Sequence, residues 1–158
     1  MLIRTPTHYF LVAGDAEGYM ELNAFDAALL RAGVGNTNLV KISSILPPGC
    51  RPTAPVPLPA GALVPVAYAA ITCSVPGEII SAAVAVAVPE DEGRPGLIME
   101  YSAYGRADIS REIVVRMAEE GMRARGVAVR EIHTAEAEHK VENKGAAFAG
   151  VVLWEKSQ

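Results

Sequence analysis

Two adjacent serines, Ser43 and Ser44, stand where the sequence allows chemistry on the backbone itself. They follow the apolar, β-branched run of residues 39–42, and a double proline at 47–48 comes soon after. The run favours extended backbone, and the prolines prevent a hydrogen-bonded strand from continuing. A serine hydroxyl held there can attack the carbonyl of the residue before it and turn the amide into an ester. The plain alternative is a strand end with two polar residues, since serines are common in loops and at caps.

Glu100 is the second residue that could do chemistry. It stands in the apolar run Leu-Ile-Met-Glu-Tyr at 97–101. A carboxyl group among apolar side chains is protonated more readily, which suits a general acid near neutral pH. The alternative is that simple strand alternation turns Glu100 to solvent, with Leu97, Met99 and Tyr101 on the other face.

Asp26 and Asn38 are polar residues with two interpretations each. Asp26 falls on the predicted apolar face of a helix over residues 23–32, with Phe25 and Leu29. It is either paired with a neighbour or an anchor for a cationic substrate, because a carboxylate meets a guanidinium with two parallel hydrogen bonds. Asn38 lies six residues before Ser44 and is, by itself, a turn asparagine.

The elements that must position these residues are mainly strands. Apolar and β-branched runs predict strands at residues 7–13, 38–45, 61–74, 79–88, 96–101, 127–141 and 146–154. The alanines of 79–88 leave a helix open there. The prolines of 47–59 predict an irregular connector, and 14–18 reads as a turn. Two helices against about seven strands favour an α+β fold of mainly antiparallel sheets packed together, with helices outside.

The helix boundaries follow from capping signals. Asn23 is a candidate cap and Gly33 a stop for the first helix. The second is predicted from Asp108, as its cap, to about residue 125, followed by Gly126. Its predicted buried stripe consists of Ile109, Ile113, Val114, Met117 and Met122.

Composition narrows the class of protein. The 158 residues predict one domain, 1–158, and the net charge of −4 without a basic cluster argues against a nucleic-acid partner. There is no leader and no apolar run long enough for a membrane helix, so a cytoplasmic protein is expected. Cys50 and Cys73 make neither a disulfide framework nor, with the scattered histidines, a metal pattern.

The whole string around the serines, Asn-Thr-Asn-Leu-Val-Lys-Ile-Ser-Ser-Ile-Leu-Pro-Pro, resembles the self-cleavage segment of the pyruvoyl-dependent arginine decarboxylases. The resemblance continues, in the family's order, through blocks at 22–30, 33–38, 61–65, 75–78, 96–101 and 148–154. It implies a four-layer α/β/β/α sandwich that cleaves itself into an N-terminal β chain, 1–43, and a C-terminal α chain, 44–158. It also implies homotrimers or a multiple of them, with the site where subunits meet.

The resemblance also implies roles for individual residues. Ser44 becomes the covalent pyruvoyl group, with no metal and no pyridoxal phosphate. Asn38 assists cleavage, and Glu100 donates the proton in decarboxylation. Asp26, helped by the new carboxylate at Ser43, binds the guanidinium of L-arginine. The product would be agmatine, which feeds polyamine biosynthesis.

Two other functions stay open from the sequence. One is an uncleaved paralogue that binds a small molecule without activity. The other is a pyruvoyl-dependent decarboxylase for a different amino acid.

Overall fold

Two helices and nine strands make up residues 4–155, the part of the chain that the computed structural model describes. In chain order they are β1 (His8–Glu17), α1 (Glu21–Ala32), β2 (Asn38–Lys41), β3 (Ile45–Leu46), β4 (Arg51–Pro52), β5 (Leu63–Cys73), β6 (Ile79–Pro89), β7 (Gly96–Tyr104), α2 (Ala107–Ala124), β8 (Val129–Lys140) and β9 (Gly145–Trp154). No helix within these residues is long and apolar enough to cross a membrane.

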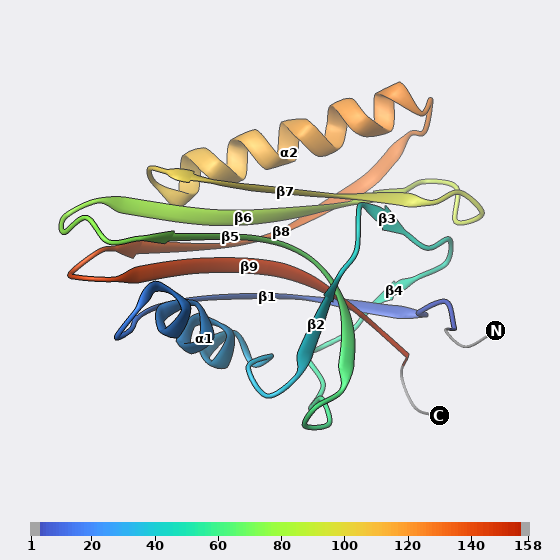
Figure 1. The fold of residues 1–158 in the computed structure, drawn as a ribbon. Helices are drawn as coiled ribbons and strands as arrows, with labels where there is room; N and C mark the ends of the chain where they lie inside the picture. The colour runs from blue at the N-terminus through green and yellow to red at the C-terminus, as the bar shows by residue number, and fades with distance from the viewer. Residues whose placement is uncertain (1–3, 156–158) are drawn as a thin grey trace.

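The elements form four layers (Figure 1). Sheet A has the strand order β2-β5-β9-β1-β4, and sheet B has the order β3-β7-β6-β8. Every pairing is antiparallel except β1 with β4 and β2 with β5. The sheets pack face to face, with α1 outside sheet A and α2 outside sheet B, which confirms the predicted α/β/β/α sandwich.

Strand β6 shows why the sheets pack as they do. Val84, Val86 and Val88 turn toward sheet A, while Ala83, Ala85 and Ala87 lie beneath α2. Side chains that alternate between two faces are typical of a strand, so residues 79–88, for which the sequence left a helix open, form a strand. Alanines on the outer face let the helix approach the sheet closely, and all six side chains are buried.

Strand β1 runs further than the sequence predicts. A turn was expected at 14–18, but β1 continues to Glu17 and pairs with β9 at ten positions. Gly14 is in this strand because α1 passes over it: a Cβ there would lie 2.4 Å from the carbonyl oxygen of Ala28. The glycine thus marks a close helix–strand contact, not a chain reversal.

The first helix begins earlier than predicted. α1 starts at Glu21, and Asn23 lies inside its first turn, where its side chain accepts the backbone N–H of Met20 at 3.2 Å. The predicted stop is confirmed, since Gly33 follows the last turn with φ 85°. The buried face is formed by Ala24 and Ala28, with Phe25 half-buried beside them.

The second helix also departs from its prediction. α2 begins at Ala107, so Asp108 is not its cap, and its buried residues are Ser110, Val114, Ala118 and Met122. Ile109 and Ile113, predicted to be buried, are exposed. Mostly small residues occupy the buried face because the helix lies against the alanine face of β6. There the Ser110 hydroxyl is 2.7 Å from that of Ser81.

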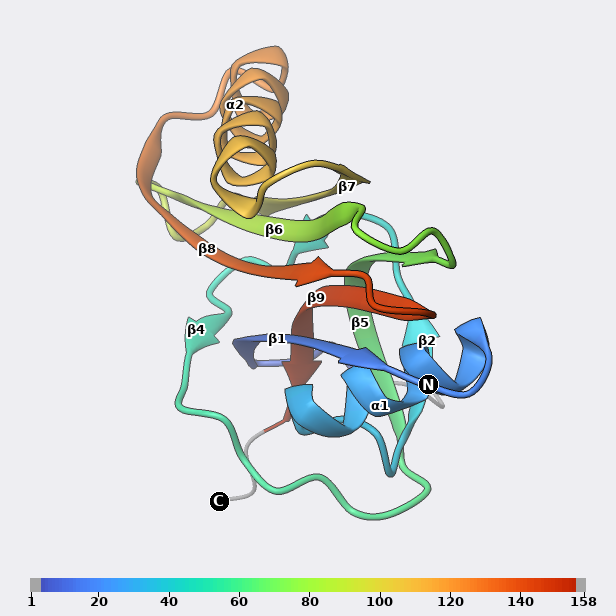
Figure 2. The ribbon, with the colours of Figure 1, turned by 90° about the vertical axis from the view of Figure 1, so that its left-hand side faces the viewer.

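The proline-rich connector crosses the molecular surface as predicted (Figure 2). Only β4 interrupts it, where Arg51 and Pro52 pair with the start of β1 in parallel. The predicted strand over 38–45 is wrong in one respect: it is broken into β2 and β3, which belong to different sheets.

A half-buried histidine joins the two sheets at one end of the sandwich. The ring of His139, on β8, contacts Asp15 through Nδ1 at 2.7 Å and Glu17 through Nε2. Burial lowers the pKa of His139, but the hydrogen bonds to the two carboxylates outweigh it, so the pKa is raised. The backbone N–H groups of Asn143 and Lys144 also donate to Glu17, and its pKa is lowered although burial opposes this.

We expect this contact to make stability depend on pH. The pKa of His139 in the folded protein lies above the unfolded value of about 6.5. The contact therefore stabilises the folded protein fully below about pH 6.5, and this contribution to the free energy of unfolding is lost as the pH rises through the folded pKa. His139→Gln should therefore lower the free energy of unfolding by about 2 kcal/mol at about pH 6 and by clearly less at about pH 9. Denaturant melts at both pH values measure this. His8→Gln, at the start of β1, is the control, and an equal loss at both pH values would contradict the prediction.

Candidate active site

The segment that carries the two serines crosses from sheet A to sheet B. The backbone N–H of Ile42 donates to Val66 of β5 at 3.1 Å, and the carbonyl of Ser44 accepts from Ile98 of β7 at 2.7 Å. Ser43 lies between these two anchors and is exposed, whereas Ser44 is half-buried. The Ser43–Ser44 peptide is therefore held from both sides where the chain passes between the sheets (Figures 1 and 2).

Glu100 lies on the same strand as the anchor of Ser44. On β7, Leu97, Met99 and Tyr101 pack toward α2, while Ile98 faces the core between the sheets. Glu100 shares the face of Ile98 and lies about 7 Å further along the strand. Alternation therefore turns Glu100 not to open solvent but to the edge of the core between the sheets, with its side chain 33% exposed.

Lys41 connects the segment that carries the two serines to Glu100. Its Nζ lies 3.2 Å from Oε1 of Glu100 and 4.7 Å from the ring centroid of Tyr68 on β5. The other oxygen, Oε2, is buried and has no hydrogen-bond partner among the described residues. A buried carboxylate oxygen without a partner is costly in a fold and marks a place where a ligand or a proton can be accommodated.

Asn38 and Asp26 are not brought to the serines in this structure. Asn38 opens β2, and its side-chain amide donates to the carbonyl of Gly61 at 3.3 Å. Asp26 is exposed on α1, so its predicted place on the buried face is wrong. It forms no ion pair with any described residue. Because α1 lies outside sheet A and Glu100 lies between the sheets, the two carboxylates belong to different layers.

Known proteins resemble this chain over nearly its whole length. A model of the pyruvoyl-dependent arginine decarboxylase family matches residues 8–157. The chain is 49% identical to the pyruvoyl-dependent arginine decarboxylase of Methanocaldococcus jannaschii, covering 97% of this chain and 93% of that one. It is 44% identical to the enzyme of that name from Pyrococcus furiosus, covering 95% and 96%. The chain belongs to the pyruvoyl-dependent arginine decarboxylase family.

The fold has a likeness outside the family. A solved structure of a pyruvoyl-dependent histidine decarboxylase matches with a TM-score of 0.51 and 13% sequence identity, over 65% of this chain and 54% of that one. At this identity the likeness concerns the fold alone.

A covalent pyruvoyl group is the cofactor that membership of the family gives to this chain. The residues fit it. Ser44 has the three carbons that such a group needs and is anchored to β7 through its carbonyl, and Glu100 has an unpartnered oxygen on the same strand. Among residues 4–155 no group of three or more His, Cys, Asp and Glu side chains has the arrangement of a metal site.

Lys41 is the residue of this site that sequence reasoning missed. A lone basic residue in the run 39–42, directly before the serines, was the available signal. Alternation along a strand cannot predict its contact with Glu100, because the two residues belong to different sheets.

Proposed function

We propose that this chain cleaves itself between Ser43 and Ser44 and then converts L-arginine to agmatine and CO2. Family membership supports the reaction, and the relatives' names favour arginine over the two other functions considered. One observation carries the proposal for the site: the carbonyl of Ser44 accepts a backbone hydrogen bond from the strand that bears Glu100.

The test is a denaturing gel of purified protein, which should show two bands, followed by measurement of CO2 release from a panel of amino acids. A single band, or no preference for arginine, contradicts the proposal.

Cleavage uses atoms of the segment itself. The Oγ of Ser44 attacks the carbonyl carbon of Ser43, and the amide becomes an ester. Elimination then releases the Ser43 carboxylate and leaves a dehydroalanine at 44, which water converts to the keto group with loss of ammonia. Asn38 would donate to the oxyanion formed in the attack, provided that its side chain leaves the carbonyl of Gly61.

The two pieces would stay in one fold after cleavage. Residues 1–43 contain β1, α1 and β2, whereas the other strands belong to 44–158. β1 pairs with β9 at ten positions, and the core residues of both pieces are shared. We therefore treat 1–158 as a single domain made of two chains.

In decarboxylation the side chains of the site bind the substrate and transfer one proton to it. The pyruvoyl group, when formed at Ser44, would supply a carbonyl for the substrate amine and a sink for the electron pair left by CO2. Glu100 then delivers a proton to the carbon that lost CO2. Asp26 and the carboxylate of Ser43 bind the guanidinium. Lys41 stays with the N-terminal piece, so its ion pair with Glu100 spans the cut.

Asp26 should decide substrate preference. Asp26→Asn keeps the size of the side chain and removes the charge, which should raise KM for arginine by about ten- to a hundredfold and change kcat little. Initial rates with arginine and with citrulline, its uncharged analogue, measure the effect. The variant should lose discrimination between the two. An unchanged arginine KM would remove Asp26 from the site.

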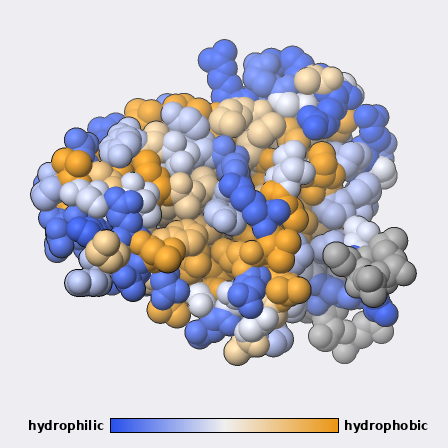
Figure 3. All heavy atoms as spheres, in the orientation of Figure 1, coloured by the Kyte–Doolittle hydropathy of each residue, from blue (hydrophilic) through white to orange (hydrophobic). Residues whose placement is uncertain are grey.

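A trimer, or a multiple of one, is the assembly we propose. Exposed apolar side chains flank the cleavage segment: Val40, Ile45 and Leu63. Figure 3 shows apolar groups gathered on the face that carries β2, β3 and β7. A neighbouring copy there could also bring its Asp26 to this Glu100, which the layers separate within one chain. Light scattering on purified protein tests the assembly, and a monomer would contradict it.

We place the enzyme in the cytoplasm, in a pathway that makes polyamines from agmatine. The free, buried thiols of Cys50 and Cys73 support a reducing compartment. Fractionation of cells tests the location.

A further inference from the structure

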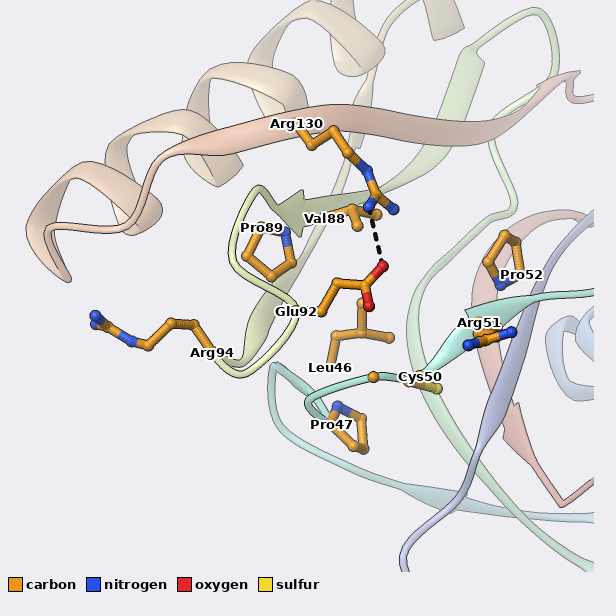
Figure 4. A pocket seen from close by; sticks show the side chains of 11 residues that line it. Leu46, Pro47, Cys50, Arg51, Pro52, Val88, Pro89, Glu92, Arg94 and Arg130 are labelled. Carbon is orange, nitrogen blue, oxygen red and sulfur yellow. Dashed lines mark ion pairs between the residues drawn. The ribbon is translucent and has the colours of Figure 1, made fainter.

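A small pocket of about 70 Å³ opens where four segments meet, away from Glu100 (Figure 4). The loop after β3, strand β4, the loop after β6 and the start of β8 form its walls. Leu46, Val88 and the thiol of Cys50 make a buried, apolar floor. The pocket is thus a firm concavity in the described residues with room for a ligand of a few heavy atoms.

Its rim carries more positive than negative charge. Arg51 and Arg130 present guanidinium groups beside the pocket (Figure 4), and Arg51 forms no ion pair with any described residue. Arg130 lies 3.5 Å from Glu92 and 3.6 Å from Glu131, both long for a charged hydrogen bond.

The acidic residue on the rim is easily displaced. The Glu92 side chain is 75% exposed and stands in the loop between β6 and β7. An ion pair so open to water contributes little. A stronger anion can therefore replace Glu92 beside Arg130 while the carboxylate turns to solvent.

We propose that this pocket binds a small oxyanion of the phosphate class between Arg51 and Arg130. The planar guanidinium fork matches the oxygens of a phosphate with paired hydrogen bonds. The volume admits a group of the size of phosphate. Leu46 lies two residues after Ser44, so the bound anion would tie the exit of the cleavage segment to β4, the β6–β7 loop and β8.

The chain offers a matched control. Arg94 also lines the rim, but its guanidinium points away from the pocket (Figure 4) and donates to the carbonyl of Arg125 at 3.4 Å. Removing this charge changes the local net charge as much as removing Arg51 or Arg130. It leaves the proposed contacts intact.

The test is calorimetric titration of the purified protein with inorganic phosphate, at constant ionic strength set with chloride. Arg51→Gln and Arg130→Gln should each weaken binding about tenfold or more, Arg94→Gln by less than about twofold, and Glu92→Gln should strengthen it severalfold. Acetate should bind more weakly than phosphate. If adenosine monophosphate binds as well as phosphate and depends on the same arginines, the source is the phosphate of a larger molecule.

Two results would overturn the proposal. One is an absence of saturable phosphate binding by the wild-type protein. The other is equal weakening by Arg94→Gln and Arg51→Gln, which would mean that phosphate only senses net charge. All four side chains lie at the rim, so folding should persist, and melting curves without phosphate verify this.

Discussion

Ser44→Ala is expected to leave one intact chain of 16.7 kDa with no detectable decarboxylase activity. The variant lacks the hydroxyl that, in the proposed mechanism, attacks the carbonyl of Ser43 and is then eliminated on the way to the keto group. No other nucleophile in the cleavage segment can do both. The change removes one partly buried oxygen, so the fold should persist. Intact-mass measurement and CO2 release are the two readouts.

Ser43→Ala is the matched control for that experiment. The carbonyl at 43 and the carboxylate that cleavage releases both belong to the backbone and survive the substitution. Two pieces and substantial activity are therefore expected. Two pieces from Ser44→Ala, or an uncut Ser43→Ala chain, would show that the hydroxyl of Ser44 is not the nucleophile.

Glu100→Gln is expected to separate cleavage from catalysis. Loss of a general acid typically costs a factor of about 10² to 10⁴, so kcat should fall in that range while the protein is still cut into two pieces. Glutamine keeps the shape beside Lys41 but removes the charge and the acidic proton. Single-turnover rates on fully cleaved protein exclude an effect through incomplete formation of the cofactor.

Glu119→Gln serves as the control, because Glu119 is an exposed carboxylate on α2, outside sheet B. It should keep wild-type kcat. A Glu100→Gln enzyme that is cleaved and as fast as wild type would exclude Glu100 as the proton donor. An uncleaved one would place Glu100 in the processing step.

The sequence predicted sheets packed on each other with helices outside, because strands outnumber helices in it, and the family resemblance implied the four layers. The valines and alanines of β6 face opposite sides as their spacing indicates, and Gly33 ends α1 where expected. The predicted helix starts were wrong by about two residues, because Asn23 and Asp108, which were predicted to cap the helices, lie inside their first turns.

The sequence did not predict the features that depend on contacts between distant segments. The extension of β1 past Gly14 depends on α1 lying over it, and the break between β2 and β3 depends on the bond from Ile98 to Ser44. No local pattern contains either partner.

In the candidate site too, residues within local strings were predicted and contacts between distant segments were not. Ser43, Ser44 and Glu100 were predicted from local strings, and one backbone hydrogen bond links Ser44 to Ile98 on the strand that carries Glu100. The contact of Lys41 with Glu100 and that of His139 with Asp15 each join two sheets, so neither could be read from its own strand.

The place of β1 in sheet A has a consequence for refolding. β1 lies between β9 and β4, so the shorter piece supplies an interior strand of the sheet. If the chain is cut as we propose, unfolding would release two molecules, and refolding would become a second-order association that dilution suppresses. The uncut chain folds in a first-order step, so under the proposal folding before cleavage would be more efficient than reassembly after it. Thermal unfolding of the cut protein should therefore be poorly reversible at low protein concentration.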